Sequence, residues 1–177
     1  EGEENTLISV PLKESQNSPN NLQMAIAQIS AELIGKYPQQ IHVVKGGQGK
    51  SRISATIAFL ILQTGHAKKV HLVFTNEVLM RKDQVDFAGL WTISKLQDSI
   101  VYHDDINFIM TEGEVIIFDE ADEYIYGNIG DFTNFVENHP CICLTATTGG
   151  SGQEAAENTI LTHIGFKIFA NALFEPE

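Results

Sequence analysis

Basic residues are scarce in this sequence. Eleven lysines and arginines stand against 23 aspartates and glutamates, which gives a formal net charge of −12 over 177 residues. Proteins that bind DNA or RNA rely largely on lysine and arginine to neutralise phosphates. The deficit argues against a broad nucleic-acid-binding face and leaves room only for a local basic site.

Long apolar runs are also missing. No segment approaches the roughly 18 uninterrupted apolar residues that a membrane-spanning helix needs. The apolar content of 43% and the charged content of 19% are ordinary for a globular protein, which excludes the collagenous and disordered classes. We therefore expect no membrane span and one compact domain, because 177 residues suit a single hydrophobic core.

Cysteine is rare as well. Cys141 and Cys143 are the only two, and at this spacing they point to the same face of a strand, which excludes a disulfide framework. The first residue is Glu1 rather than methionine, and nothing near it resembles a signal peptide. These features predict a cytoplasmic, intracellular location and a chain that is a fragment of a longer protein.

The order of the hydrophobic patterns predicts an α/β fold. The first 20 residues lack a sustained period and are expected to form an N-terminal arm, so the domain should span residues 21–177. Short apolar runs without alternation are typical of strands covered on both faces, as in a parallel sheet. Such runs alternate with segments of helical period. We therefore predict a doubly wound, mainly parallel sheet with helices on both faces.

The expected elements follow from these periods. Helices are predicted at residues 22–33, 51–63, 78–95, 131–137 and 153–163. Strands are predicted at residues 41–44, 70–74, 106–110, 115–118, 141–144 and 166–170.

A glycine-rich segment joins the first predicted strand to the second predicted helix. It reads Val44-Lys45-Gly46-Gly47-Gln48-Gly49-Lys50-Ser51, followed by Arg52. Backbone N–H groups can converge on a phosphate only where side chains leave room, and a helix N-terminus adds about half a positive charge. Lys50 would reach the outer phosphates, and the Ser51 hydroxyl would bind Mg²⁺. The strict pattern has glycine where Val44 stands, and a glycine-rich turn that merely precedes Lys-Ser is the alternative.

A cluster of carboxylates follows the strand predicted at residues 115–118. It reads Asp119-Glu120-Ala121-Asp122. In open parallel sheets, ligands bind outside the carboxyl ends of the strands, which is where these side chains stand. Asp119 is the candidate Mg²⁺ ligand, and Glu120 is the candidate to orient and polarise an attacking water. A solvated acidic turn is the alternative.

These two segments, together with Leu144-Thr145-Ala146-Thr147, resemble motifs I, II and III of the superfamily 2 helicase-type ATPases. The likeness is closest to the motor of the SecA family of preprotein translocase ATPases. SecA proteins read M-K-T-G-E-G-K-T where this chain has residues 44–51. Their next strand reads V-H-V-V-T-V-N-D-Y-L-A-x-R-D, which resembles residues 70–83 here. The resemblance covers about residues 22–169.

This resemblance implies the first of two RecA-like lobes, with ATP and Mg²⁺ as cofactors and ATP hydrolysis as the activity. Lys50 and Glu120 would act in catalysis, and Ser51 and Asp119 would hold the metal. The nucleotide itself would lie against Gly46, Gly47, Gln48, Gly49, Lys50, Ser51 and Arg52. The implied partners are a second RecA-like lobe or a partner protein, and a polypeptide substrate.

The resemblance also implies two outlying roles. Thr145 and Thr147, with Asp122, would couple the nucleotide site to the other lobe. A glutamine on the helix before the glycine-rich loop would read adenine, and the usual spacing favours Gln28 over Gln23.

The chain departs from the family pattern in its middle. Only four residues separate the strands predicted at 106–110 and 115–118, where helicases of this type carry a helix and a further substrate-binding motif. Part of a nucleic-acid track is therefore missing, and we expect nucleic acid to bind weakly. The second lobe, with its arginine finger, would follow residue 177, so we expect very slow hydrolysis by this chain alone. The translocated substrate stays open, and a non-catalytic nucleotide-binding scaffold is the alternative function.

The remaining ionisable residues carry weaker signals. The six histidines show no pairing at metal-ligand spacing, and His103-Asp104-Asp105 is expected to form a solvated turn. Arg81 and Asp83 fall in the segment that resembles SecA, where they form either part of a functional surface or a structural salt bridge.

Overall fold

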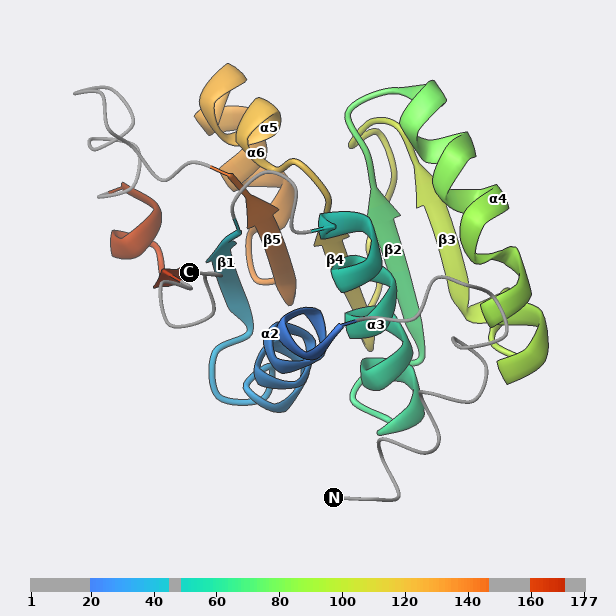
Figure 1. Ribbon diagram of the computed structural model, residues 1–177. Coiled ribbons are helices and arrows are strands. Elements are labelled where there is room, and N and C mark those ends of the chain that lie inside the picture. The colour runs from blue at the N-terminus through green and yellow to red at the C-terminus, as the bar shows by residue number, and fades with distance from the viewer. Residues whose placement is uncertain (1–19, 45–48, 147–159, 171–177) are drawn as a thin grey trace.

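A six-stranded parallel sheet forms the centre of the molecule. The computed structural model describes residues 20–44, 49–146 and 160–170. Within these residues the strands are β1 (Gln39–Val43), β2 (Lys69–Val73), β3 (Ile100–His103), β4 (Glu114–Phe118), β5 (Cys141–Thr145) and β6 (Lys167–Ala170). Their order is β3-β2-β4-β5-β1-β6, every pairing is parallel, and the strand arrows in Figure 1 share one direction. The predicted α/β, doubly wound sheet is confirmed.

Helices cover both faces of the sheet. The described helices are α2 (Asn21–Glu32), α3 (Lys50–Gln63), α4 (Glu77–Ser94), the 3₁₀ turn η1 (Gln97–Ser99), α5 (Asp122–Gly127) and α6 (Ile129–Val136). Side chains of α2, α3 and α4 share one hydrophobic cluster with one sheet face, and those of α5 and α6 share a second cluster with the other face (Figure 1). Among the described helices, none is both long and apolar enough to cross a membrane.

Local sequence signals explain where the helices of the first face begin. Asn20 caps α2 through a reciprocal pair of hydrogen bonds with Gln23, at 2.8 and 3.0 Å. Asn76 caps α4 by accepting the Leu79 backbone N–H at 2.9 Å. α3 is buried on most of its circumference, as its nearly continuous apolar sequence predicts, because it packs against both α2 and the sheet.

The strand order places three segments side by side. β5 lies between β1 and β4, and all three strands end at nearly the same level, since Val43 pairs with Thr145 and Phe118 pairs with Cys143. The chain moves from β1 to β2 and β3 in one direction, then returns through β4 and β5 and passes β1 to reach β6. Such a reversal opens a crevice at the carboxyl edge of a doubly wound sheet.

One strand prediction is wrong. Residues 106–110 form neither helix nor strand, and the edge strand is instead β3, which was not predicted. Ile106, Phe108 and Met110 alternate as in a strand, but they pack onto the α5 and α6 face from an irregular connection. β3 carries tyrosine and histidine at a half-buried edge, so its hydrophobic signal is weak. The short helix α5 was missed for a related reason, because the acidic cluster hides its start.

Other predicted elements are confirmed with small shifts at their ends. Of the helix predicted at 153–163, only residues 160–163 lie within the described chain, and they are helical. The N-terminal arm lies outside the described residues. Cys141 and Cys143 lie on one face of β5, completely buried, with their Sγ atoms 3.5 Å apart.

A buried histidine on β1 is a weak point of the core in acid. The Nε2–H of His42 donates to Gln40 Oε1 at 2.7 Å, and the ring stacks on Phe169 with centroids 4.6 Å apart. Its Nδ1 atom is buried without a hydrogen-bond partner, so the ring is held neutral. Burial lowers the pKa of His42 to about 4.

We expect this histidine to reduce stability as the pH falls. The unfolded chain takes up the proton near pH 6.5 and the folded chain only near pH 4, so up to about 3 kcal/mol of stability is lost between these values. His42→Gln keeps an N–H donor without a titrating group and should lack this loss. Urea unfolding of both proteins from pH 7.5 to 4 measures it, and a constant difference between them would contradict the assignment.

Candidate functional site

Four predicted residues meet at the carboxyl edge of the sheet. Lys50 and Ser51 begin α3 just after β1, while Asp119 and Glu120 follow β4. Lys50 Nζ lies 3.3 Å from Glu120 Oε1, and the Ser51 hydroxyl donates to Asp119 Oδ2 at 3.3 Å. The structure therefore brings together the two segments that the sequence marked independently.

The N-terminus of α3 is open toward the crevice. Gly49, at its N-cap, adopts a left-handed conformation with φ of 74° and offers no side chain to cap the helix. The first turn also carries no acidic residue. The positive end of the helix dipole is thus left without a carboxylate of its own, which is the arrangement that favours an anion.

The structure separates the two glutamines proposed to read adenine, and only one of them lies at the crevice. Gln28 lies beside Leu60 and Thr64, near the far end of α3 from Lys50. Gln23, the alternative that the spacing disfavoured, lies against Gly49 and lines the crevice. The two glutamines are five positions apart on α2, more than one helical turn, so sequence spacing alone could not choose the end of the helix.

Asp119 has the environment of an incomplete cation site. It is only 7% exposed, and its Oδ1 atom has no hydrogen-bond partner. Burial, and then the negative charges of Glu120 and Asp122, raise the pKa of Asp119 to about 6. A carboxylate oxygen and a serine hydroxyl in contact are hard oxygen ligands, which suit Mg²⁺. The residues present therefore fit the predicted metal.

Glu120 is held in a strained backbone conformation. Its φ is +56°, in the left-handed region that non-glycine residues rarely adopt, at a cost of about 1 kcal/mol or more. Its side chain is 41% exposed, whereas that of Lys50 is only 9% exposed. The turn thus separates the two carboxylates, with Asp119 directed inward and Glu120 placed at the open side.

A second buried carboxylate lies behind the site, and the sequence left its role open. Asp83, on α4, is 4% exposed and has an unpartnered Oδ1 atom. Burial and the charge of Asp119 raise the pKa of Asp83 to about 7, while a hydrogen bond from Tyr102 lowers it. Tyr102 accepts a hydrogen bond from Trp91 Nε1 at 2.9 Å. The alternative of an Arg81–Asp83 salt bridge is wrong, because Arg81 pairs with Glu77 at 2.7 Å.

The predicted coupling residues are partly described. Thr145 ends β5, is completely buried, and its carbonyl oxygen accepts the Val44 N–H at 2.8 Å. The next carbonyl back, that of Leu144, accepts the Ala121 N–H at 2.9 Å. The end of β5 is therefore hydrogen-bonded to the segments after both β1 and β4. Asp122 begins α5 and keeps a buried Oδ1 atom without a partner.

Several predicted residues lie outside the described chain: Gly46, Gly47, Gln48 and Thr147. Arg52 is described and lines the crevice beside Ser51. Lys82 and Asp86 of α4, paired at 2.8 Å, form another wall. The whole crevice has a volume of about 580 Å³.

A second hollow of about 650 Å³ lies at the opposite edge of the sheet, beside Pro38, Gln39 and Pro140. The Gln39 amide there donates to the backbone oxygens of Val136 and His139, at 2.7 and 3.1 Å. These bonds tie the start of β1 to the end of α6. We place the candidate site in the first crevice, because only there do the two sequence motifs converge.

We expect Gly49→Ala to destabilise the protein. The left-handed conformation costs a residue with a Cβ about 1–2 kcal/mol, and the new atom would overlap Gln23 Nε2 and disturb the cap of α2. Gly89→Ala is the matched control, because Gly89 lies in α4 with open space around it and alanine there should stabilise by about 0.5–1 kcal/mol. Equal effects in urea unfolding would contradict this geometry.

We expect Asp83→Asn to stabilise the protein above neutral pH. The folded chain binds this proton near pH 7 and the unfolded chain near pH 3.8, so wild-type stability falls by up to about 4 kcal/mol as the pH rises between these values. Asparagine can still accept from Tyr102 but carries no charge. The gain should be large at pH 8 and small at pH 4 in unfolding experiments without divalent cations, and a gain independent of pH would refute it.

No protein-family model matches this chain, and no curated protein matches it significantly. The likeness to superfamily 2 motors therefore rests on the three motifs and on their meeting at one edge of the sheet.

Proposed function

We propose that this chain binds Mg²⁺–ATP in the crevice and acts as the ATP-hydrolysing motor lobe of a SecA-like or helicase-like protein, completed by a second RecA-like lobe. The observation that carries the proposal is the convergence of Lys50 and Ser51 with Asp119 and Glu120 at the ends of β1 and β4. Two contacts join the segments, Lys50 with Glu120 and Ser51 with Asp119, and each pairs residue types that a phosphate and metal site would use.

The phosphates would lie at the N-terminus of α3. The open first turn supplies backbone N–H groups, and Lys50 supplies a positive charge on a side chain that is already held at the crevice. Arg52 and Lys82 add positive charge to its walls. Three carboxylates, those of Asp86, Asp119 and Glu120, line the same crevice, so its positive charge is local to the start of α3 and would suit a small anion bound with Mg²⁺ rather than a polyanion.

Mg²⁺ would be held by the Ser51 hydroxyl and Asp119. When bound, the ion neutralises charge on the β- and γ-phosphates. The bound ion would also stabilise the ionised form of Asp119, because that carboxylate is buried near two other acidic residues and one of its oxygens has no partner. The hydroxyl now donates to Asp119 and would turn its lone pairs toward the metal.

Glu120 would orient the attacking water. Its carboxylate is now paired with Lys50, and the nucleotide would compete for that lysine. Release from Lys50 would leave a half-exposed carboxylate at the open side of the crevice, where it can accept a hydrogen bond from water. The ion pair thus holds both catalytic side chains in place until the substrate separates them.

Rapid hydrolysis would need a cation from elsewhere. The sequence has two arginines, and Arg81 is engaged by Glu77 on the surface of α4 while Arg52 adjoins the metal ligand. An arginine finger is worth about 10³–10⁵ in rate. A second lobe or a partner protein would supply it. The acidic charge favours a polypeptide over nucleic acid as the substrate that such a motor would move.

We expect Mg²⁺–ATP or Mg²⁺–ADP to stabilise this protein. At about 100 times the dissociation constant, the ligand should add about 2.7 kcal/mol, which a thermal melt detects. Lys50→Ala should abolish the shift, because the phosphates lose their main charged contact. Lys36→Ala, at an exposed position on the turn after α2, is the matched control and should leave the shift unchanged.

Glu120→Gln distinguishes the ATP-hydrolysing motor from the alternative function, a non-catalytic nucleotide-binding scaffold. Binding should persist, because Glu120 is not placed to hold the nucleotide, whereas phosphate release by the chain joined to its second lobe should fall by orders of magnitude. Unchanged turnover would favour a nucleotide-binding scaffold. No heat in calorimetry and no thermal shift at millimolar nucleotide would overturn both functions.

A further inference from the structure

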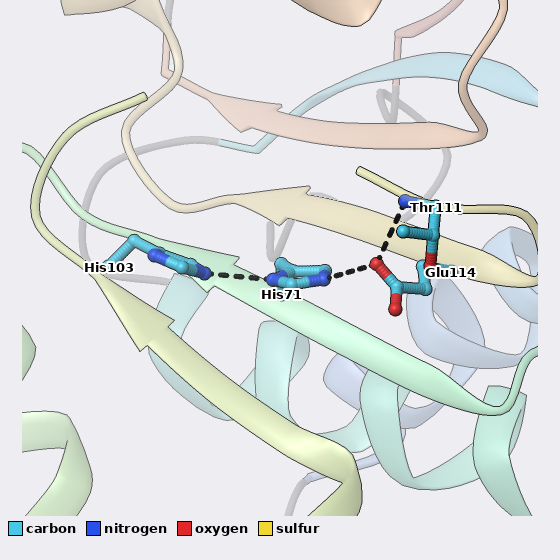
Figure 2. Close-up of polar contacts among 4 residues, drawn as sticks. All are labelled: His71, His103, Thr111 and Glu114. Atoms are coloured by element: carbon cyan, nitrogen blue, oxygen red, sulfur yellow. Dashed lines mark hydrogen bonds and ion pairs between the residues drawn. The ribbon is translucent and has the colours of Figure 1, made fainter. Parts of the chain in front are cut away.

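Three ionisable side chains form a hydrogen-bonded row on the sheet, away from the nucleotide crevice. His103 Nε2 lies 2.8 Å from His71 Nδ1, and His71 Nε2 lies 2.8 Å from Glu114 Oε1. Figure 2 shows the row running from β3 across β2 to the start of β4, with the Thr111 N–H also donating to Glu114 at 3.1 Å. His71 and Glu114 are each 6% exposed.

The hydrogen bonds fix which atoms carry protons. Burial raises the pKa of Glu114, but the hydrogen bonds from His71 and Thr111 outweigh it and lower the pKa to about 2, so Glu114 is an anion. His71 Nε2 must then donate to it. The remaining contact needs one proton between His71 Nδ1 and His103 Nε2. When both rings are neutral, His103 Nε2–H donates it, because the one proton of His71 is on Nε2.

The row can therefore hold one added proton but not two. With one, a cationic His71 lies beside Glu114 and donates to a neutral His103, so both 2.8 Å contacts persist. With two, both facing nitrogens carry hydrogen, and the bond between the rings is lost. Burial and the charge of His71 lower the pKa of His103 to about 4, although Asp105 and Asp104 raise it.

The same row holds down the irregular connection at residues 104–113. The Phe108 ring stacks on His103 with centroids 3.5 Å apart and an interplanar angle of 8°, and it lies 5.0 Å from the His71 ring. Thr111 is tied to Glu114 through its backbone. The connection contains neither helix nor strand, so these contacts replace the regular hydrogen bonds that would otherwise fix it.

Other charged or titratable groups surround the row on every packed element. β2 adds Lys69, which is in register with Glu114, and Lys68 before it packs on Gly113.

The connection itself carries Asp104, Asp105 and Glu112. α5 adds Tyr124, whose hydroxyl donates to the Asp104 carbonyl at 3.2 Å. Burial raises the pKa of Tyr124 to about 12, so it stays protonated. α6 contributes the uncharged ring of Phe135.

A metal-binding role for this row has no support, because no group of three His, Cys, Asp or Glu side chains in the described part of the chain could hold an ion. Proton uptake is the chemistry that this geometry allows.

We propose that the Glu114–His71–His103 row is a proton-operated latch, which holds residues 104–113 on the sheet while it carries at most one added proton and releases them when a second added proton reaches His103. Release would uncover a strip of the sheet between β3 and β4 that Phe108 now covers. The latch does not depend on the nucleotide site.

Hydrogen exchange of the Thr111 amide tests the proposal. A free imidazole binds a proton near pH 6.5, and the closed latch resists it until about pH 4. The equilibrium constant for release of the Thr111 amide, corrected for intrinsic exchange, should therefore rise by up to about tenfold for each unit that the pH falls from 6.5 to 4. The Ile116 amide, in the centre of β4, serves as the internal control for global unfolding.

His103→Gln provides the decisive variant. Its amide can still donate to His71 Nδ1 but takes up no proton, so the opening constant of Thr111 should become independent of pH within about twofold. His66→Gln, at an exposed histidine after α3, is the matched control and should behave as the wild type. A pH-independent wild-type opening constant, or a pH dependence that survives in His103→Gln, would overturn the latch.

Ring nitrogen resonances give a second readout that needs no variant. Titration of ¹⁵N-labelled protein should show that His103 takes up a second ring proton only near pH 4. Both rings fully protonated at pH 5, with the Thr111 amide still protected, would also overturn the proposal.

Discussion

The parallel pairing of β1, β5 and β4 is the constraint on which the site depends. Because the three strands run in the same direction and end at the same level, the segments that follow them must emerge at one edge. Backbone hydrogen bonds extend the pairing past the strand ends, from Val44 to Thr145 and from Ala121 to Leu144. A shift of β5 by one residue would break both bonds. The positions of the polar side chains are therefore set by a buried apolar framework.

That edge also concentrates buried negative charge. Asp119 and Asp83 approach it from β4 and α4, each with an oxygen that lacks a partner, and the charge of Asp119 helps to raise the pKa of Asp83. A fold optimised only for stability would not place two such carboxylates together. The strained φ of Glu120 also favours a functional site, because strained backbone conformations are concentrated at such sites, where the surrounding structure imposes them. These features support a site that is relaxed by binding a cation, as we propose.

The fold was largely predictable from the sequence, because continuous apolar runs and helical periods are patterns among residues close together in the chain. The contact between the glycine-rich and acidic segments was also predictable, since parallel strands must present their ends together. The edge strand β3 was not, because a half-buried strand of tyrosine and histidine has no strong pattern. The position of Gln23, rather than Gln28, beside the crevice depends on which end of α2 faces Gly49, and sequence spacing does not reveal that tertiary arrangement. The pairing of His71 with His103 joins residues 32 positions apart, so no local spacing could reveal it.

The two cysteines give the molecule a built-in reporter of its integrity. Both thiols lie in the middle of the sheet, completely buried, and burial raises the pKa of the Cys141 thiol well above its usual value. A thiol reagent attacks the thiolate form and needs access to sulfur, so neither cysteine can react while β5 is covered. Local release of a surface connection would leave both cysteines unreactive, whereas separation of the helices from the sheet would expose both thiols at once. Their labelling rate therefore records global opening without any introduced probe.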